Sequence, residues 1–213
     1  MKKIYVCVTV TALLQGGCSM QHPVTIYENL ANEQKLCCSD YKEMKFVALS
    51  AAGEQAFDID SDTPVFNFKD GRSKFVAVAL PSRSKTSALQ LRTHVISLRI
   101  EPVAFDPFIT FLDQGYVSLG EVVPQMKMTT GFFSGRAWET MIPIPESAAY
   151  AIVYTKPVLY RTFMYYNPEK SLTLVPGPVP LLLPTQAVPI MAAPHGKISM
   201  EILSNLPLNT GSK

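Results

Sequence analysis

Three aspartates, Asp58, Asp60 and Asp62, alternate in the D-x-D-x-D spacing that opens an EF-hand calcium loop. That loop also needs a glycine at the next position and, at its end, a glutamate that binds the ion through both carboxylate oxygens. Thr63 and Lys69 stand at those two positions. The sequence therefore predicts a plain acidic loop and no bound metal; a looser calcium site at a strand end is the alternative.

The sequence has few residues in the patterns that nucleophilic catalysis requires. Ser82-x-x-Lys85 matches the nucleophile motif of penicillin-binding proteins, but the Ser-x-Asn and Lys-Thr-Gly partners of that motif are absent. The three histidines, His22, His94 and His195, are scattered, which argues against a Ser-His-Asp triad. Paired carboxylates for glycoside hydrolysis cannot be judged from spacing alone. We expect a protein that is not an enzyme, with no catalytic residues and no cofactor.

Aromatic side chains offer a different chemistry, because a sugar ring stacks on an exposed aromatic face while polar neighbours bind its hydroxyls. Trp138 is the only tryptophan, and tyrosines including Tyr150 and Tyr154 crowd the stretch that follows it. These three residues are the candidate ligand-binding side chains. The favoured alternative is that Trp138 and Tyr150 are core residues of facing strands, since large aromatic side chains are mostly buried.

The first residues have the composition of a signal peptide. Lys2 and Lys3 give a positive start, and the apolar run Ile4–Leu14 follows. That run is too short to cross a bilayer, which requires about 20 apolar residues. We expect residues 1–17 to be removed during export to the periplasm.

Gly16-Gly17 directly before Cys18 resembles the bacterial lipobox, in which diacylglycerol is added to the cysteine thiol and the chain is cut before it. The departure is Gln15, where the lipobox usually has an aliphatic residue; Leu14 lies one place early. Ser19 favours the outer membrane, since an aspartate there would resemble an inner-membrane retention signal. We expect a lipid anchor on Cys18 in the outer membrane; the alternative is an ordinary cleaved signal with Cys18 just beyond the cut.

The remaining cysteines form an adjacent pair. Of the four cysteines in the sequence, Cys7 leaves with the signal peptide and Cys18 is acylated, so that Cys37 and Cys38 remain. Periplasmic thiols tend to be oxidised, whereas neighbouring cysteines bridge only through a strained ring. A Cys37–Cys38 disulfide is thus a candidate that the sequence leaves open. A metal site is disfavoured because no second cysteine pair is present.

Charge excludes one class of partner. Of 19 basic residues, Lys2 and Lys3 leave with the signal peptide, so that 17 basic and 17 acidic residues remain. Binding to nucleic acid needs a positive surface that displaces counterions. We therefore expect no nucleic-acid partner.

The rest of the chain divides into a tether, a domain and a tail. Residues 18–43 are polar with a weak helical stripe at Ile26 and Leu30, and we expect a partly helical tether there. Residues 44–206 show many short strand patterns separated by turns, and the sequence has 17 prolines and 11 glycines, which suits β structure. Residues 207–213 are a polar C-terminal tail. The prediction is all-β, with a single β-sandwich domain that is jelly-roll-like.

The clearest hairpin pairs Val65–Phe68 with Ser73–Leu80 through Asp70-Gly71, because Asp-Gly supplies the positive φ of a tight turn. The proline-rich stretch Leu172–Pro194 predicts an extended crossing loop or an edge segment. Lys197–Leu203 alternates apolar and polar residues and predicts a closing strand. Its core-facing residues would be Ile198, Met200 and Ile202. Further strands are predicted at residues 44–50, 88–102 with a break near His94, 108–112, 137–144 and 149–155.

The order of these segments resembles the maltose operon periplasmic protein (MalM) family. The residues that carry the resemblance are Cys37-Cys38, Phe57-Asp58-Ile59, Phe75–Pro81, Val103–Asp113 with Pro107 and the exit Phe111-Leu112-Asp113-Gln114, Ala149–Thr155, and Pro194-His195-Gly196-Lys197. Each motif alone is weak evidence for the family. Together and in this order, the motifs span nearly all of the mature chain. The chain lacks the long Ala/Pro-rich and helical extension of better-known enteric members.

The resemblance implies an exported, non-enzymatic protein that is accessory to maltose or maltodextrin transport, with maltodextrin or an envelope transport protein as partner. It carries no catalytic residues over to this chain. The alternative is a structural or assembly lipoprotein that binds another envelope protein and no sugar. The lipid-anchor motif is compatible with both.

The anchor is directly testable. Replacement of Cys18 by alanine removes the thiol that accepts the lipid, so the variant should lose palmitate labelling and move from the membrane fraction to the soluble periplasm. Labelling and fractionation of wild type and variant measure this. Unlabelled wild type whose fractionation equals that of the variant would contradict lipidation.

Overall fold

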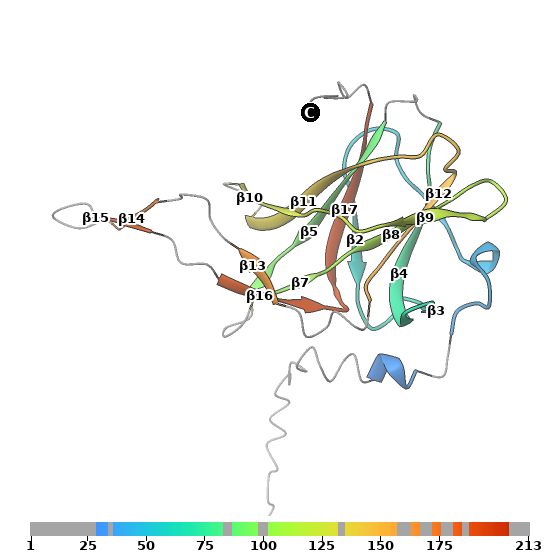
Figure 1. The fold of residues 1–213 in the computed structure, drawn as a ribbon, viewed down its shortest axis with the longest axis horizontal. Helices are drawn as coiled ribbons and strands as arrows, with labels where there is room; N and C mark the ends of the chain where they lie inside the picture. The colour runs from blue at the N-terminus through green and yellow to red at the C-terminus, as the bar shows by residue number, and fades with distance from the viewer. Residues whose placement is uncertain are drawn as a thin grey trace, which may run out of the picture.

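The computed structural model describes residues 29–33, 36–82, 87–97, 102–131, 135–156, 163–166, 172–175, 181–184 and 188–204. Strands dominate them and pack as a sandwich of two sheets with a further sheet at its side (Figure 1), which confirms the predicted all-β fold. The expected signal peptide, Cys18 and the tail at 207–213 lie outside the described residues. In the described part, no helix has both the length and the apolar character that a membrane crossing requires.

Sheet A is the first layer of the sandwich. Its strands, in spatial order, are β1 (Val47–Ala48), β4 (Gly71–Ala79), β12 (Tyr150–Tyr154), β8 (Phe108–Leu112) and β9 (Ser118–Val122), and β3 (Val65–Phe68) pairs with the start of β4. All pairs are antiparallel except the short β1–β4 pair. Strand β8 is buried at all five positions and β4 at the six consecutive positions from Ser73 to Val78, because both of their faces are covered.

Sheet B is the second layer. Its order is β10 (Lys127–Gly131), β11 (Gly135–Pro143), β5 (Ala88–His94), β17 (Gly196–Leu203) and β2 (Gln55–Ile59), and every pair is antiparallel. The last strand of the chain therefore lies inside the sheet, between β5 and β2 (Figure 1).

The main hydrophobic core lies between the two sheets. Because side chains alternate across a strand, every second residue points inward. Val76 and Val78 of β4 belong to the same buried cluster as Leu89 and Leu91 of β5 and Met200 of β17. Burial of such a side chain contributes about 1.5–3 kcal/mol, so this contact between sheets is the largest source of stability in the domain.

Strand β17 confirms the predicted closing strand. Ile198 and Met200 are 0% exposed and Ile202 is 7% exposed, and all three belong to the main core. The strand begins at Gly196, which has φ +155°, and a Cβ built there would lie 3.3 Å from the Cβ of Phe105. A glycine is required at that close approach.

The predicted hairpin is also confirmed. Phe68 pairs with Gly71 across the turn, and Gly71 has φ +124°, which an L side chain rarely adopts. The strand predicted over 88–102 is interrupted at Val95, between β5 and the short β6 (Ile96–Ser97). In the segment predicted as a strand at 44–50, only Val47–Ala48 pairs.

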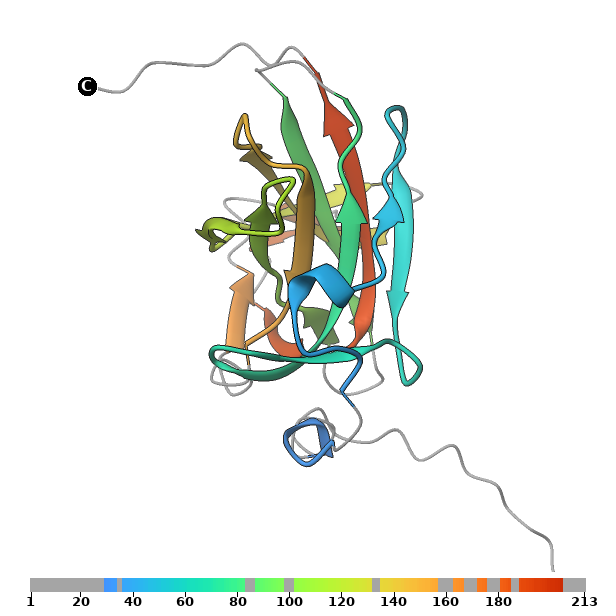
Figure 2. The ribbon, with the colours of Figure 1, turned by 90° about the vertical axis from the view of Figure 1, so that its right-hand side faces the viewer.

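Part of the expected tether belongs to the domain. Residues 29–31 are helical, and Leu30 is buried beside Val65. Residues 36–46, with the 3-10 helix η1 (Tyr41–Glu43), lie across the outer face of sheet A (Figure 2), where Met44 is buried in a second apolar cluster. The physical reason is that this face is apolar and has to be covered. Polar sequence alone did not show it.

A smaller sheet extends the sandwich at one side. Its order is β13 (Phe163–Tyr166), β16 (Val188–Ala193), β7 (Pro102–Phe105) and β6, and a separate hairpin of β14 (Leu172–Val175) and β15 (Leu181–Pro184) lies away from it (Figure 1). The proline-rich stretch predicted as a loop or edge thus holds three short strands. Pro189 lies where β16 is paired only with β13, so its missing N–H breaks no ladder on the other side.

The position of β17 makes a sharp prediction. Truncation before Pro194 removes the strand between β5 and β2 together with several buried side chains, in a domain whose reserve is about 5–15 kcal/mol. We expect this variant to be unfolded or degraded, as measured by circular dichroism and thermal melting. The matched control, deletion of 209–213, should leave the melting temperature unchanged. An unchanged melting temperature for the longer truncation would contradict the assignment of β17.

Candidate ligand-binding site

A cleft of about 500 Å³ lies at one end of sheet A, where three connections meet. Its walls are the end of β4 at Leu80–Ser82, the β8–β9 loop at Asp113–Gly115 and the β11–β12 loop at Glu146–Ala149. The antiparallel register brings these connections together, because Tyr150 pairs with both Ala79 and Leu112. The volume falls in the range of roughly 300–1,000 Å³ that is typical of small-molecule sites.

The β8–β9 loop is built around the Asp113 carboxylate. Asp113 Oδ1 accepts hydrogen bonds from the backbone N–H groups of Gly115 at 2.8 Å and Val117 at 2.9 Å. The backbone of Asp113 also bonds to Tyr116 and Val117 at 3.1 and 3.0 Å. An aspartate that accepts bonds from backbone N–H groups two and four residues further on fixes a tight local turn.

That turn holds Tyr116 in an unusual conformation. Tyr116 has φ +63°, and among the described residues it is the only non-glycine with positive φ. This left-handed conformation costs roughly 1–3 kcal/mol for a bulky L residue and persists only where the surroundings determine it. Such strain is concentrated at functional sites, so Tyr116 marks this loop as a candidate site.

The Tyr116 ring is held in an aromatic cluster beside the cleft. It stacks on the Tyr150 ring, with centroids 4.7 Å apart and planes 12° apart, and the Phe46 ring lies 4.5 Å from that of Tyr150. The Tyr150 hydroxyl donates to the Tyr116 hydroxyl at 3.2 Å, and this hydrogen bond is the main cause that raises the pKa of Tyr150. All three rings are half-buried, so apolar ring surface and phenol hydroxyls are exposed together.

The structure does not bring the three predicted aromatic residues together. Trp138 is buried on β11 of sheet B, in a cluster with Ala104 and Ile190, and its indole Nε1 has no partner among the described residues. Tyr154 is buried on sheet A, where its ring stacks on Phe68. Trp138 thus has the buried position of the core-residue alternative, whereas Tyr150 is half-buried and directly follows Ala149 of the cleft lining.

The hydroxyl of Tyr154 belongs to a network of charged side chains on the outer face of sheet A. It donates to Glu121, and burial followed by this hydrogen bond raises the pKa of Tyr154. Lys156 Nζ lies 2.5 Å from Glu121 and 2.6 Å from Asp70, and 4.8 Å from the centroid of the Phe108 ring. The network connects three neighbouring strands and stabilises the sheet.

A second polar network covers the outer face of sheet B. Arg92 pairs with Glu54 at 2.8 Å and with Glu139 at 3.0 Å. Ser199 donates to Glu54, and its hydroxyl lies 3.4 Å from Nε2 of His94. In a catalytic triad the carboxylate orients the histidine, whereas here it accepts from the serine. Ser199 is also buried, so the arrangement differs from a triad and connects neighbouring strands of the sheet.

In the acidic loop, Asp60 uses its carboxylate within the turn. Asp60 Oδ1 accepts from the backbone N–H of Asp62 at 2.9 Å, and the N–H of Asp60 donates to the Thr63 hydroxyl at 2.9 Å. In the described part of the chain, no group of three or more His, Cys, Asp or Glu side chains is placed to hold a metal ion.

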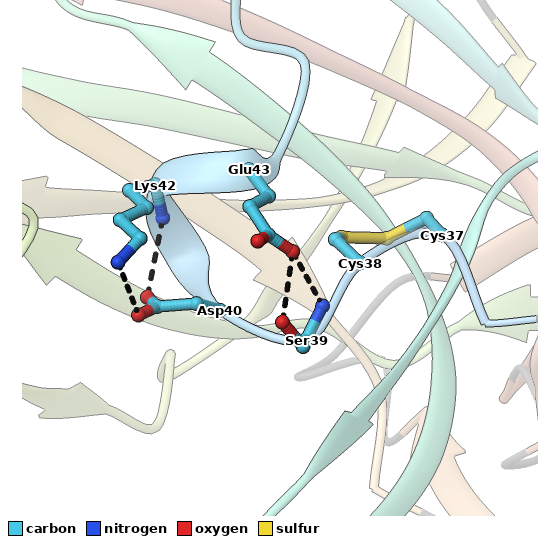
Figure 3. The surroundings of a disulfide bond; sticks show 6 residues. All are labelled: Cys37, Cys38, Ser39, Asp40, Lys42 and Glu43. Atoms are coloured by element: carbon cyan, nitrogen blue, oxygen red, sulfur yellow. Dashed lines mark hydrogen bonds and ion pairs between the residues drawn. A yellow bond between two sulfur atoms is a disulfide. The ribbon is translucent and has the colours of Figure 1, made fainter.

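Cys37 and Cys38 are joined by a disulfide in the structure (Figure 3). The next turn is fixed by Glu43, which accepts from both the backbone N–H and the hydroxyl of Ser39, at 2.8 and 2.9 Å. These two bonds are the main causes that lower the pKa of Glu43. The disulfide therefore lies on an ordered segment against sheet A, with Cys38 packed on the outer cluster.

Comparison with known proteins gives no relative: no family model, no curated protein and no solved structure matches this chain.

Two residues of the site were missed by sequence reasoning. Tyr116 and Phe46 come from a loop and from the covering segment, and neither lies in a motif of its own. The only local signal was Asp113-Gln114-Gly115, which predicts a tight turn after β8. It does not indicate that the backbone of the next residue, Tyr116, is left-handed.

The Asp113 turn can be tested by mutation. Asp113→Ala removes the acceptor of two backbone N–H groups, and the free energy of unfolding should fall by about 1–2 kcal/mol. Gln114→Ala in the same loop is the control and should change it by less than ~0.5 kcal/mol. Urea denaturation measures both variants. Equal stability of Asp113→Ala and wild type would show that the loop does not depend on this carboxylate.

Proposed function

We propose that this chain is a non-enzymatic, lipid-anchored protein of the bacterial outer membrane. Its β-sandwich binds a maltodextrin-type saccharide and serves as an accessory to carbohydrate transport. Cys18 carries the anchor, and the cleft beside Tyr116 and Tyr150 binds the sugar. The order of motifs that resembles the maltose operon periplasmic protein family supports the choice of maltodextrin.

The observation that carries the proposal is the strained Tyr116. A left-handed tyrosine held by Asp113 and stacked on Tyr150 has no need of this geometry for the main core, because neither ring belongs to it. Its effect is to fix two half-exposed phenol rings that directly follow, along the chain, the cleft-lining residues Gly115 and Ala149. A pyranose ring has an apolar C–H face and a rim of hydroxyls, and it matches such a surface.

The polar lining of the cleft supports a hydroxylated ligand. Ser82, Asp113, Gln114 and Ser147 place hydroxyl, carboxylate and amide groups on the three connections that form its walls. Side chains of this mixed kind both donate and accept, as the hydroxyls of a sugar require.

A specific feature favours the alternative, an assembly protein that binds another envelope protein. Strand β9 is the edge of sheet A, and the apolar side chains Val117, Leu119 and Val123 on or beside it are 62%, 38% and 63% exposed. An exposed edge with apolar residues can accept a strand from a partner.

Calorimetric titration with maltoheptaose tests the proposed function. Wild type should bind, and its melting temperature should rise with ligand, since a ligand that binds only the native state stabilises it. Tyr116→Ala should weaken binding at least about tenfold, equivalent to ~1.4 kcal/mol. Met141→Ala, an exposed change on sheet B, should bind like wild type.

The position of Trp138 sharpens this experiment. Because Trp138 is buried on the opposite sheet, its fluorescence should not change when the sugar binds. Neither binding heat nor a melting shift at millimolar maltoheptaose would contradict sugar binding and favour the assembly alternative. A large change in Trp138 fluorescence would place the sugar away from Tyr116.

A further inference from the structure

A second cavity, of about 510 Å³, lies beside the disulfide. Its apolar wall includes Leu36, Cys37 and Pro64, and its polar wall is the turn Ser61–Thr63 between β2 and β3. The backbone N–H of Cys37 donates to the carbonyl of Val65 at 2.9 Å, and this bond holds the disulfide against the start of β3. The covering segment and the β2–β3 turn thus form the cavity together.

The disulfide lowers the conformational entropy of the unfolded chain very little, so it stabilises the fold little by that route. Its cysteines are adjacent in sequence, and a cross-link removes more chain entropy the longer the loop that it closes. What it provides is a fixed, polarisable sulfur surface. Cys38 is half-buried against the outer aromatic cluster, whereas Cys37 is exposed and lines the cavity. Sulfur in such a place gives an apolar contact of defined shape.

Charged groups of both signs surround this cavity. Lys74, 7% exposed, donates to the backbone carbonyl of Asp60, and the negative charges of Asp60, Asp62 and Glu33 act on it, which opposes the lowering of its pKa by burial. Arg72 donates to the carbonyl of Ala31 at 3.0 Å on the same segment. A charged ligand of either sign would meet like charges here, so the cavity suits a neutral one.

The polar wall has acceptor capacity to spare. The Asp62 carboxylate is exposed, and it accepts a hydrogen bond from the Ser61 hydroxyl at 3.3 Å. A carboxylate offers about four lone-pair positions. Hydroxyl donors of a ligand can therefore bind at Asp62, while an apolar ligand would leave this carboxylate without new partners.

We infer that the cavity between the Cys37–Cys38 disulfide and the Ser61–Thr63 turn is a second ligand site, which takes a neutral polyhydroxylated ring such as a pyranose. The ring packs its C–H face on Cys37, Leu36 and Pro64, and it donates hydroxyls to Asp62. This site does not depend on the cleft at Tyr116, because it lies at the other end of strand β4: Val65 pairs with Lys74, whereas the cleft begins at Leu80.

Amide chemical-shift mapping with maltose distinguishes the two sites. The inference predicts shifts at residues 61–65 and 37–38 in the full chain. Shifts confined to 113–117 and 146–150 would overturn it and support the proposed cleft alone. No shifts at millimolar maltose would overturn both.

Two variants test the chemistry of the site. Asp62→Ala keeps the disulfide and should weaken maltose binding at 61–65 about tenfold, and Cys37→Ser with Cys38→Ser should weaken it at least as much. Lys42→Ala, an exposed change on the covering segment, is the control and should bind like wild type. Undiminished binding by Asp62→Ala, or by wild type after reduction of the disulfide, would overturn the inference even if the double serine variant fails to fold.

Discussion

The central strands of sheet A, β4, β12 and β8, bury apolar side chains on both faces, and the rest of the molecule is arranged around that constraint. The inner face of sheet A packs on sheet B, and its outer face carries a second buried cluster that includes Phe75, Phe108 and Ile152. A two-sided apolar sheet cannot face water, so the chain has to supply a second cover. Strand β3 and the segment 36–46 provide it, and this requirement orders a stretch that would otherwise be a tether.

Much of the fold could be predicted because burial on both faces is visible in sequence. A strand covered on two sides has a continuous apolar run, and Phe108–Leu112 and 149–155 have such runs. Strands with one covered face show alternation instead, as in β17. The Asp-Gly turn at Gly71 fixes its own hairpin because few residues tolerate that φ. These patterns depend only on residues close together in the sequence, so a single sequence is enough to recognise them.

The site could not be predicted because its contacts are long-range. The rings of Phe46, Tyr116 and Tyr150 come from three segments that only the sheet register brings together. Trp138 and Tyr154 were candidates by residue type alone, and which face of a strand is covered depends on the partner sheet. The packing of residues 29–33 and 36–43 was missed for a related reason: most of their polar residues face water, and few of their side chains provide the contact.

The covering segment joins the two cavities. It is held at Cys37 by the carbonyl of Val65, and it ends where Val47 pairs with Val78, so it runs along β4 from one end to the other. One of its residues, Cys37, lines the cavity at the first end, and Phe46 contributes a ring beside the cleft at the second. A change that loosened the segment would therefore alter both cavities at once. Substitutions in the turns distinguish the two sites better, because the backbone at Asp62 and in the loop after Asp113 is fixed by local hydrogen bonds.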